Sequence, residues 1–361
     1  MPDSHRSWCT ISLAALRSNL RTLRRAAPPG TRVLAVVKDN AYGHGLIPVA
    51  RALARAGCEE FGVAFASEGA ELRQAGIREP ILLLGSSLPS EFPLALAHRL
   101  TVTLSSLPEA RELARAAETG RTTALVQAKL DTGMNRLGAK PRDFLPLVAF
   151  ITRHPRLELV GTFTHLACSS SDPKFTRRQL DESFLLPMTG RRHYANTAAS
   201  LSRPPYPMTH IRPGIGLYGI DPRSAGRVSL RPVLSWKSRI LVVRQVRRGE
   251  TVSYGATFRA PRDLRIATVA TGYADGLPFS LGNRGHGLVR GRLCPIVGRV
   301  TMDMTLLDVS SLPSARRGDE VVWIGRSGGK VRNAVDLADE AGTIPWEIFT
   351  RIAPRIPRLY V

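Results

Sequence analysis

Several features that mark other protein classes are missing from this sequence. It has only four cysteines in 361 residues and no C-x-x-C pair, so neither a zinc site nor a disulfide framework is expected. The cysteines are Cys9, Cys58, Cys168 and Cys294. Apolar segments such as Ile81–Leu84 are far shorter than the roughly 20 residues that span a bilayer. The first ten residues contain Asp3 and Arg6 and lead into no long apolar run, so no signal peptide is expected. These absences favour a cytoplasmic protein without a metal site.

Acidic residues are scarce relative to basic ones. The chain has 51 lysines and arginines against 29 aspartates and glutamates, which gives a net charge of +22. Such a charge attracts nucleic acids or anionic membranes, but the basic residues are spread along the chain and no nucleic-acid motif accompanies them. We therefore expect no specific nucleic acid and no membrane as partner. The excess of basic residues reflects either an arginine-rich proteome or a preference for anionic ligands.

The first two-thirds of the chain alternates short apolar strands with helical patterns. The predicted strands are Thr31–Lys38, Glu60–Phe65, Pro80–Leu84, Leu100–Leu104, Thr123–Leu130, Leu157–Thr164, Arg192–Ala195 and Met208–Arg212. Helical patterns such as Ile47–Ala56 and Glu68–Ala75 lie between them, with Gly57 and Gly76 as C-terminal stops. This element count is that of a TIM-like (β/α)8 barrel, so residues 1–232 are predicted to form one.

The pattern changes after about residue 230. Predicted strands now follow one another with glycine, proline and aspartate turns and few helical periods between them. They are Ser235–Val246, Ile266–Ala270, Gly287–Val300, Thr305–Val309 and Glu320–Ile324. Residues 233–361 are therefore predicted to form a second, mostly β domain, and the fold class is α/β plus β.

Lysine 38 is the first candidate for catalysis, because barrel enzymes carry their reactive groups just beyond the carboxyl ends of the strands. Lys38 closes the first predicted strand, after the apolar run Val33–Val37. A lysine there is expected to point into the barrel mouth, where partial desolvation makes an amine a better nucleophile and base. The alternative is a surface lysine at a strand end.

The last two barrel strands lead into a candidate phosphate site. The eighth strand ends at Arg212, before residues 213–216, and the seventh ends near Asn196 and Thr197. Backbone N–H groups and small hydroxyls in these loops often bind phosphate in barrels, and Gly214 and Thr197 suit that role. With a lysine across the mouth, the pattern predicts a phosphorylated aldehyde cofactor.

Two other strand ends carry polar candidates. Arg136 follows the fifth strand and has the planar fork that binds a substrate carboxylate. His165 ends the sixth strand, where a histidine is either structural or catalytic.

These segments together resemble alanine racemases over essentially the whole chain, in order and with matching spacing. The similar segments are Ala35–Gly45, Asp131–Gly138, Thr164–His165, His193–Ala199, Arg212–Gly219, Val252–Gly255, Gly272–Gly276, Val297–Asp303 and Arg355–Tyr360. The resemblance implies a racemase that interconverts L-alanine and D-alanine with pyridoxal 5'-phosphate. It also implies a cytoplasmic enzyme that supplies D-alanine, with peptidoglycan synthesis as the expected use.

The resemblance further implies a head-to-tail homodimer whose active sites each join one barrel to the other subunit's β domain. Lys38 would bind the cofactor covalently, and Lys38 and Tyr254 of the partner subunit would be the two acid–base groups. Arg212 would donate to the pyridine nitrogen. The implied cofactor contacts are Lys38, Tyr42, His165, Asn196, Thr197, Arg212, Gly214, Ile215 and Tyr360. The implied substrate contacts are Arg136, Tyr273, Met302 and Asp303. Lys129 matches a lysine that is often carbamylated in the family.

The sequence departs from the family pattern at a few positions. Asp39 replaces a small residue after Lys38, Thr301 stands where cysteine is common, Thr197 replaces a serine, and Phe279 stands where arginine is frequent. No departure removes a required group. A carboxylate directly after Lys38 is the most consequential of them, but strand alternation predicts that it points away from the lysine.

Other functions are weighed against this one. A racemase of another small amino acid, such as serine, fits the same residues. A barrel-type pyridoxal-phosphate amino-acid decarboxylase would bring a longer β domain and a catalytic cysteine near the C-terminus, whereas the last cysteine here is Cys294. A non-enzymatic cofactor carrier would need the barrel alone, and the second domain with Tyr254 argues against it.

Overall fold

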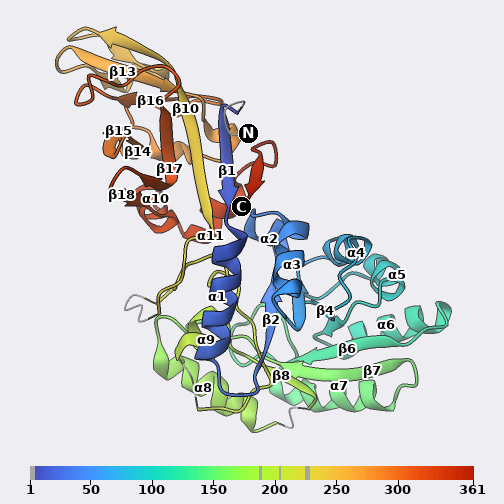
Figure 1. The fold of residues 1–361 in the computed structure, drawn as a ribbon. Helices are drawn as coiled ribbons and strands as arrows, with labels where there is room; N and C mark the ends of the chain where they lie inside the picture. The colour runs from blue at the N-terminus through green and yellow to red at the C-terminus, as the bar shows by residue number, and fades with distance from the viewer. Residues whose placement is uncertain (1–4, 187–188, 203–204, 224–227) are drawn as a thin grey trace. The chain divides into compact units, whose positions relative to one another are not determined.

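The computed structural model describes residues 5–186, 189–202, 205–223 and 228–361. It forms two compact units (Figure 1). The barrel unit consists of residues 14–41 and 45–231, and the β unit consists of residues 1–13, 42–44 and 232–361.

Parallel strands form the centre of the barrel unit. They are β2 (Arg32–Val36), β3 (Glu60–Val63), β4 (Ile81–Leu83), β5 (Val102–Leu104), β6 (Ala124–Lys129), β7 (Leu157–Phe163), β8 (Arg191–His193) and β9 (His210–Ile211). They pair in the orders β4-β3-β2-β9 and β5-β6-β7-β8. A parallel bridge between Leu82 and Thr101 joins β4 to β5. The Thr209 amide donates to the Arg192 carbonyl at 2.8 Å and brings β9 beside β8. The ring closes, and the predicted barrel is confirmed.

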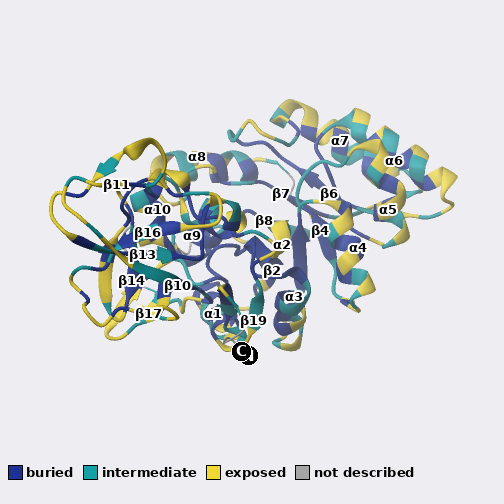
Figure 2. Cartoon of the chain, turned by 90° about the horizontal axis from the view of Figure 1, so that it is seen from above, coloured by how far each residue is buried: buried dark blue, intermediate teal, exposed yellow. Residues whose placement is uncertain are grey.

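Helices that bury one apolar stripe surround these strands. They are α1 (Leu13–Ala26), α3 (Leu46–Arg55), α4 (Ala66–Gln74), α5 (Phe92–Ala97), α6 (Leu107–Thr119), α7 (Pro141–Arg153), α8 (Pro173–Phe184) and α9 (Thr197–Ser202). Leu16, Leu20 and Leu23 form the buried stripe of α1. Gly57 and Gly76, with φ of 80° and 87°, follow α3 and α4 as the predicted stops. Figure 2 shows the outer faces of these helices exposed and the barrel strands buried.

The β unit is built on a nine-stranded sheet with the order β15-β14-β17-β10-β1-β19, to which β13, β16 and β18 add. The strands of the unit are β1 (Ser7–Ile11), β10 (Leu234–Val246), β11 (Thr251–Val252), β12 (Phe258–Arg259), β13 (Leu264–Val269), β14 (His286–Val289), β15 (Arg292–Pro295), β16 (Thr305–Asp308), β17 (Glu320–Ser327), β18 (Lys330–Arg332) and β19 (Arg358–Tyr360). Two helices, α10 (Ala334–Ala341) and α11 (Pro345–Arg351), accompany them. The mostly β second part of the chain is confirmed.

Two sequence-based predictions of element bounds were wrong in detail. Residues 287–300 do not form one strand. A two-residue turn at Arg290 and Gly291, with φ of 45° and 80°, splits the segment into the β14–β15 hairpin, because positive φ at both central residues matches the twist of paired strands. The apolar period over Ile11–Arg25 predicts an opening helix from Ile11, but α1 begins at Leu13 because Ser7–Ile11 pairs with β10 and β19.

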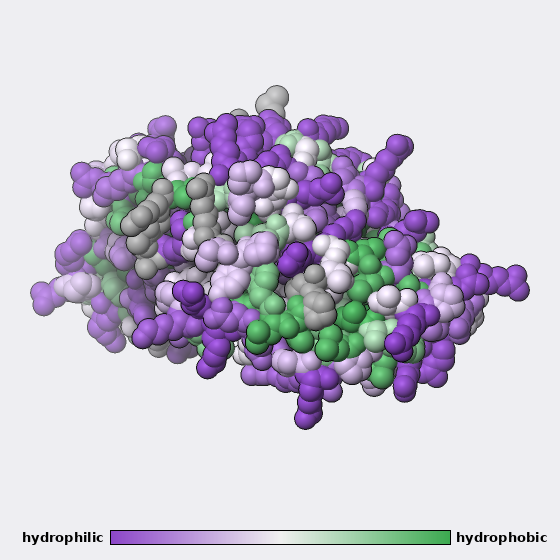
Figure 3. Space-filling view, turned by 90° about the horizontal axis from the view of Figure 1, so that it is seen from below, coloured by the Kyte–Doolittle hydropathy of each residue, from purple (hydrophilic) through white to green (hydrophobic). Residues whose placement is uncertain are grey.

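The surface is polar over wide areas. Hydrophilic side chains cover most of the face drawn in Figure 3 and enclose smaller apolar areas. None of the helices in the described part of the chain combines the length and apolar character required to span a bilayer.

Candidate active site

Lys38 begins a left-handed turn at the carboxyl end of the barrel. Strand β2 ends at Val36, and the next element, α2 (Lys38–Tyr42), has φ of 53–54° from Asp39 to Tyr42. Each left-handed non-glycine residue costs roughly 1–2 kcal/mol. Two hydrogen bonds hold the turn: Ala41 N–H donates to the Val37 carbonyl at 2.8 Å, and Leu46 N–H donates to Asn40 Oδ1 at 2.7 Å. The Lys38 side chain is 40% exposed.

The predicted orientation of Asp39 was wrong. Asp39 Oδ2 lies 3.3 Å from Lys38 Nζ and forms an ion pair with it. Strand alternation does not apply here, because β2 ends at Val36 and Lys38 and Asp39 already belong to the helical turn α2.

Four cationic side chains act on the half-buried His165. Burial holds the pKa of His165 well below its usual value, and the charges of Arg212, Lys129, Arg136 and Lys38 lower it further. His165 is therefore uncharged at neutral pH, while four positive groups gather near it. This end of the barrel is suited to anionic groups such as phosphate and carboxylate.

Arg212 is buried and held rigidly. Its Nη2 donates to the Thr164 carbonyl at 2.8 Å and to His165 Nδ1 at 3.0 Å, and its Nη1 donates to His193 Nδ1. Burial lowers the pKa of Arg212 to about 9, so the guanidinium is still protonated at neutral pH. Its Nε has no hydrogen-bond partner among the described residues and is a donor available to a ligand.

His193 and Gln127 position Arg212 and were missed in the sequence analysis. Burial and the charge of Arg212 hold the pKa of His193 well below its usual value. Since His193 Nδ1 accepts from Arg212, its Nε2–H donates to Gln127 Oε1 at 2.6 Å. The available signal was a glutamine inside the apolar strand β6 and a histidine ending β8.

Lys129, at the end of β6, has its amine where a positive charge is unfavourable. Burial, with the charges of Arg212 and Arg136, lowers its pKa to about 8. The loop beyond it is organised by Asp131, which pairs with Lys140 at 2.6 Å and accepts from the amides of Gly133 and Asn135. This loop carries the exposed Arg136.

The loop after β9 folds over Thr197. Thr197 Oγ1 accepts from the Gly214 and Gly216 amides, each at 3.2 Å. The Ile215 N–H between them has no acceptor among the described residues, which leaves a backbone donor for an anion. A Cβ on Gly216 would lie 2.6 Å from Thr197 Cγ2. Asn196 acts locally, because its Oδ1 accepts from Ser169 and from the Ala199 amide.

In the β unit, Tyr254, Tyr273 and Met302 share a cleft of about 360 Å³ that Asp303 also lines. The exposed fractions of the first three are 73%, 41% and 56%. Backbone hydrogen bonds fix the wall: the Ala274 amide donates to the Met302 carbonyl at 3.0 Å. Asp303 Oδ1 also accepts from Arg355 at 2.9 Å.

Tyr42 and Tyr360 lie elsewhere in the β unit. Tyr42 is buried, and the Tyr360 hydroxyl donates to the His44 carbonyl at 3.2 Å. Arg358 Nε donates to the Gly43 carbonyl at 3.1 Å in the same region. Strand β19 therefore binds the segment that directly follows the Lys38 turn.

The chain matches known proteins over nearly its whole length. Residues 11–222 match the family model for the alanine racemase N-terminal domain, and residues 233–360 match the model for the alanine racemase C-terminal domain. The alanine racemase of Methylacidiphilum infernorum is 39% identical over 367 residues, which cover 99% of this chain and 94% of that protein.

Solved structures of alanine racemases are also similar to this chain. An alanine racemase from Clostridium difficile 630 superposes with a TM-score of 0.93 at 31% identity, covering 99% of this chain and 96% of that one. Alanine racemase from Bartonella henselae, with covalently bound pyridoxal phosphate, superposes with a TM-score of 0.91 at 29% identity, covering 99% and 100%. The chain thus belongs to the alanine racemase family and is an amino-acid isomerase of that kind.

Proposed function

We propose that this alanine racemase works with pyridoxal 5'-phosphate, which Lys38 binds covalently, and that Lys38 and Tyr254 of the partner subunit are its two acid–base groups. The observation that carries the proposal is the gathering of Lys38, Lys129, Arg136 and Arg212 around the uncharged His165. Such a mouth suits a ligand that brings both a phosphate and a carboxylate.

The residues of the barrel end fit this cofactor. The Ile215 N–H, with Gly214 and Thr197 beside it, would hold the phosphate, together with Tyr42 and Tyr360. Arg212 would donate from its unused Nε to the ring nitrogen. His165 and Asn196 would lie beside the ring or hold the residues that contact it. Pyridoxal phosphate, when bound, supplies an electron-withdrawing system that makes the α-hydrogen of an amino acid removable.

The substrate carboxylate would be held by Arg136 and the backbone at Met302. Arginine presents two parallel donors to a carboxylate. Lys129, when carbamylated, would place a negative charge beside Arg136 and orient it. Tyr273 and Asp303, from the same cleft as Tyr254, would limit the space to a small side chain such as that of alanine.

Racemisation requires one group to take the α-proton and another to return a proton to the opposite face. Lys38 and Tyr254 would fill these roles. A homodimer is proposed because Tyr254 and Met302 are exposed in the single chain, and exposed apolar clusters typically mark an interface. The carboxylate-binding and proton-transferring groups would then come from both subunits.

We further place the reaction in the cytoplasm, with D-alanine going to peptidoglycan. The free cysteines, two of them fully buried, are compatible with a reducing compartment.

A chiral assay tests the proposal. Purified protein with pyridoxal phosphate and L-alanine is expected to form D-alanine until the two are nearly equal. Lys38→Ala and Tyr254→Phe should each lower the rate by about a hundred- to ten-thousandfold, the range for loss of a general acid–base group. D-alanine formation at the wild-type rate by either variant would contradict the assigned role.

A further inference from the structure

The barrel unit has a cavity at the amino ends of its strands, the end opposite to Lys38. Its volume is about 550 Å³. Pro80 and Thr101 directly precede β4 and β5, and Leu125 and Arg191 lie in the first two residues of β6 and β8. This size is in the range of small-molecule sites.

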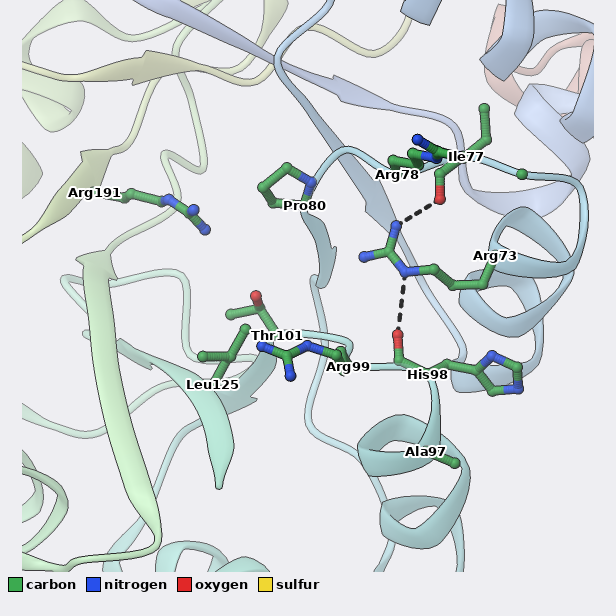
Figure 4. A pocket seen from close by; sticks show the side chains of 11 residues that line it. Arg73, Ile77, Arg78, Pro80, Ala97, His98, Arg99, Thr101, Leu125 and Arg191 are labelled. Carbon is green, nitrogen blue, oxygen red and sulfur yellow. Dashed lines mark hydrogen bonds between the residues drawn. The ribbon is translucent and has the colours of Figure 1, made fainter. Parts of the chain in front are cut away.

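Four arginines from separate segments line this cavity: Arg73 from α4, Arg78 from the loop after it, Arg99 from the turn after α5, and Arg191 from the start of β8. In Figure 4 the side chains of Arg191 and Arg99 approach the open space from opposite sides, and Arg73 faces it from α4.

Arg73 is held in place by backbone carbonyls. Its Nε donates to the His98 carbonyl at 3.1 Å, and its Nη1 donates to the carbonyls of Ile77 and Glu79 at 2.8 and 2.7 Å. The third nitrogen, Nη2, has no partner among the described residues and points into the cavity in Figure 4. Arg73 is thus a fixed donor that needs no ordering when a ligand binds.

Arg191 is fixed by a carboxylate, because its Nη1 donates to Glu60 Oε1 at 3.0 Å. Glu60 itself is 1% exposed, so it cannot turn away into solvent. The anchored end leaves the other nitrogens of Arg191 for the cavity.

The positive charge is only partly balanced. Glu60 pairs with Arg191, and Glu79 acts on Arg73. Arg78 and Arg99 form no ion pair with any described residue. Burial of Arg73 lowers the pKa of its guanidinium, and the positive charge of Arg99 lowers that pKa further. Like charges around an open space are unfavourable until an anion lies between them.

We propose that this cavity binds a small anion that carries a phosphoryl group. Guanidinium groups match the tetrahedral oxygens of phosphate with paired donors, and two of the four are already fixed. The site lies at the opposite ends of the strands from Lys38 and does not depend on the proposed cofactor chemistry.

Calorimetry with the cofactor-loaded enzyme tests this site, with pyrophosphate as the probe and citrate as a comparison at equal ionic strength. Saturable binding of pyrophosphate, tighter than that of citrate, is expected. Arg99→Gln should weaken it by about tenfold or more, as should Arg73→Gln, because each removes a charge-assisted contact. Arg121→Gln is the matched control: Arg121 follows α6 with φ of 49°, as Arg99 follows α5 with φ of 49°, but it does not line the cavity.

Four results would overturn the proposal. Binding that Arg99→Gln leaves unchanged would place the anion elsewhere, and binding that Arg121→Gln weakens equally would reflect net charge alone. The other two are the absence of saturable pyrophosphate binding and citrate binding as tight as that of pyrophosphate. Arg99 is exposed, so Arg99→Gln is expected to fold. It therefore tests the site even if Arg73→Gln does not fold.

Discussion

Lys129 has an amine whose charge is disfavoured by its surroundings. Its pKa is lowered to about 8 by burial and by Arg212 and Arg136, so a larger fraction is uncharged near neutral pH than for an ordinary lysine. Only the uncharged amine reacts with carbon dioxide, and the resulting carbamate would be stabilised by the same arginines. We predict that protein equilibrated with ¹³C-bicarbonate shows a carbamate carbon by NMR.

The signal should grow as the pH rises through about 8 and should be absent from Lys129→Arg. A spectrum without the signal, or one that the variant shares, would rule out carbamylation at Lys129. Lys129→Arg is also expected to raise KM for alanine more than it lowers kcat, because the carbamate would act through Arg136.

Asp39 is expected to slow the binding of the cofactor by Lys38. Its ion pair with Lys38 must break before the amine can attack the cofactor. Both side chains are about two-fifths exposed, at 40% and 43%, so the pair contributes at most about 1 kcal/mol. Asp39→Ala should therefore bind pyridoxal phosphate faster, by no more than about fivefold, when mixing of apoenzyme and cofactor is followed by absorbance. Asp39→Glu should restore the slower rate, and slower association in Asp39→Ala would refute this role.

At the scale of elements, the turn after Lys38 depends on Gly43. Gly43 has φ of 75°, and a Cβ there would lie 2.3 Å from the Phe349 carbonyl oxygen. Gly43→Ala would combine backbone strain with a clash against α11. We expect it to lower the free energy of unfolding by about 1–3 kcal/mol more than strain alone does.

Gly57→Ala is the control for this prediction. Gly57 has φ of 80° but nothing within 4 Å of a Cβ, so only strain of about 1 kcal/mol applies. Thermal unfolding of both variants measures the difference. Equal losses of stability would show that the contact with Phe349 does not hold the turn.

Helices and strands that a local sequence pattern marks were predicted from the sequence. Elements that depend on contacts with remote parts of the chain were not. Strands β2 to β9 were found because apolar runs alternate with capped helical patterns. The left-handed turn at Asp39–Tyr42 was missed because none of its residues is a glycine. Distant contacts are made by the next residue, Gly43, which lies against Phe349 and accepts from Arg358. Strand β1 was missed because its pairing partners are β10 and β19.

The candidate site follows the same rule. Lys38, Arg212 and Thr197 stood at predicted strand ends. His193 and Gln127 form their network across the barrel and lie 66 positions apart in sequence, so no local pattern connects them to Arg212.

For the whole molecule, two histidines whose charged forms are disfavoured in the fold predict sensitivity to acid. The pKa values of His165 and His193 are well below the usual value of about 6.5 because of burial and nearby cations. The unfolded chain therefore binds protons that the folded chain does not. Stability present above about pH 6.5 is lost as the pH falls below it, by about 1.4 kcal/mol per pH unit for each histidine. His193→Gln should make the fall in melting temperature between pH 6.5 and pH 5 shallower, and an unchanged slope would contradict this account.

The net charge of +22 has two local counterparts in the fold. One is the cationic barrel mouth around His165, and the other is the arginine-lined cavity at the opposite ends of the strands. Both are suited to small anions.

We propose that Lys38 and Tyr254 of the partner subunit act together in one site, and mixing two inactive variants shows whether they do. Lys38→Ala and Tyr254→Phe are dissociated, mixed in equal amounts and reassociated, and D-alanine formation is measured. If the site is shared, each mixed dimer regains one intact site, and activity should return to about a quarter of the wild-type rate. If activity stays at the level of the separate variants while mixed dimers are present, both groups come from one chain and the shared site is wrong.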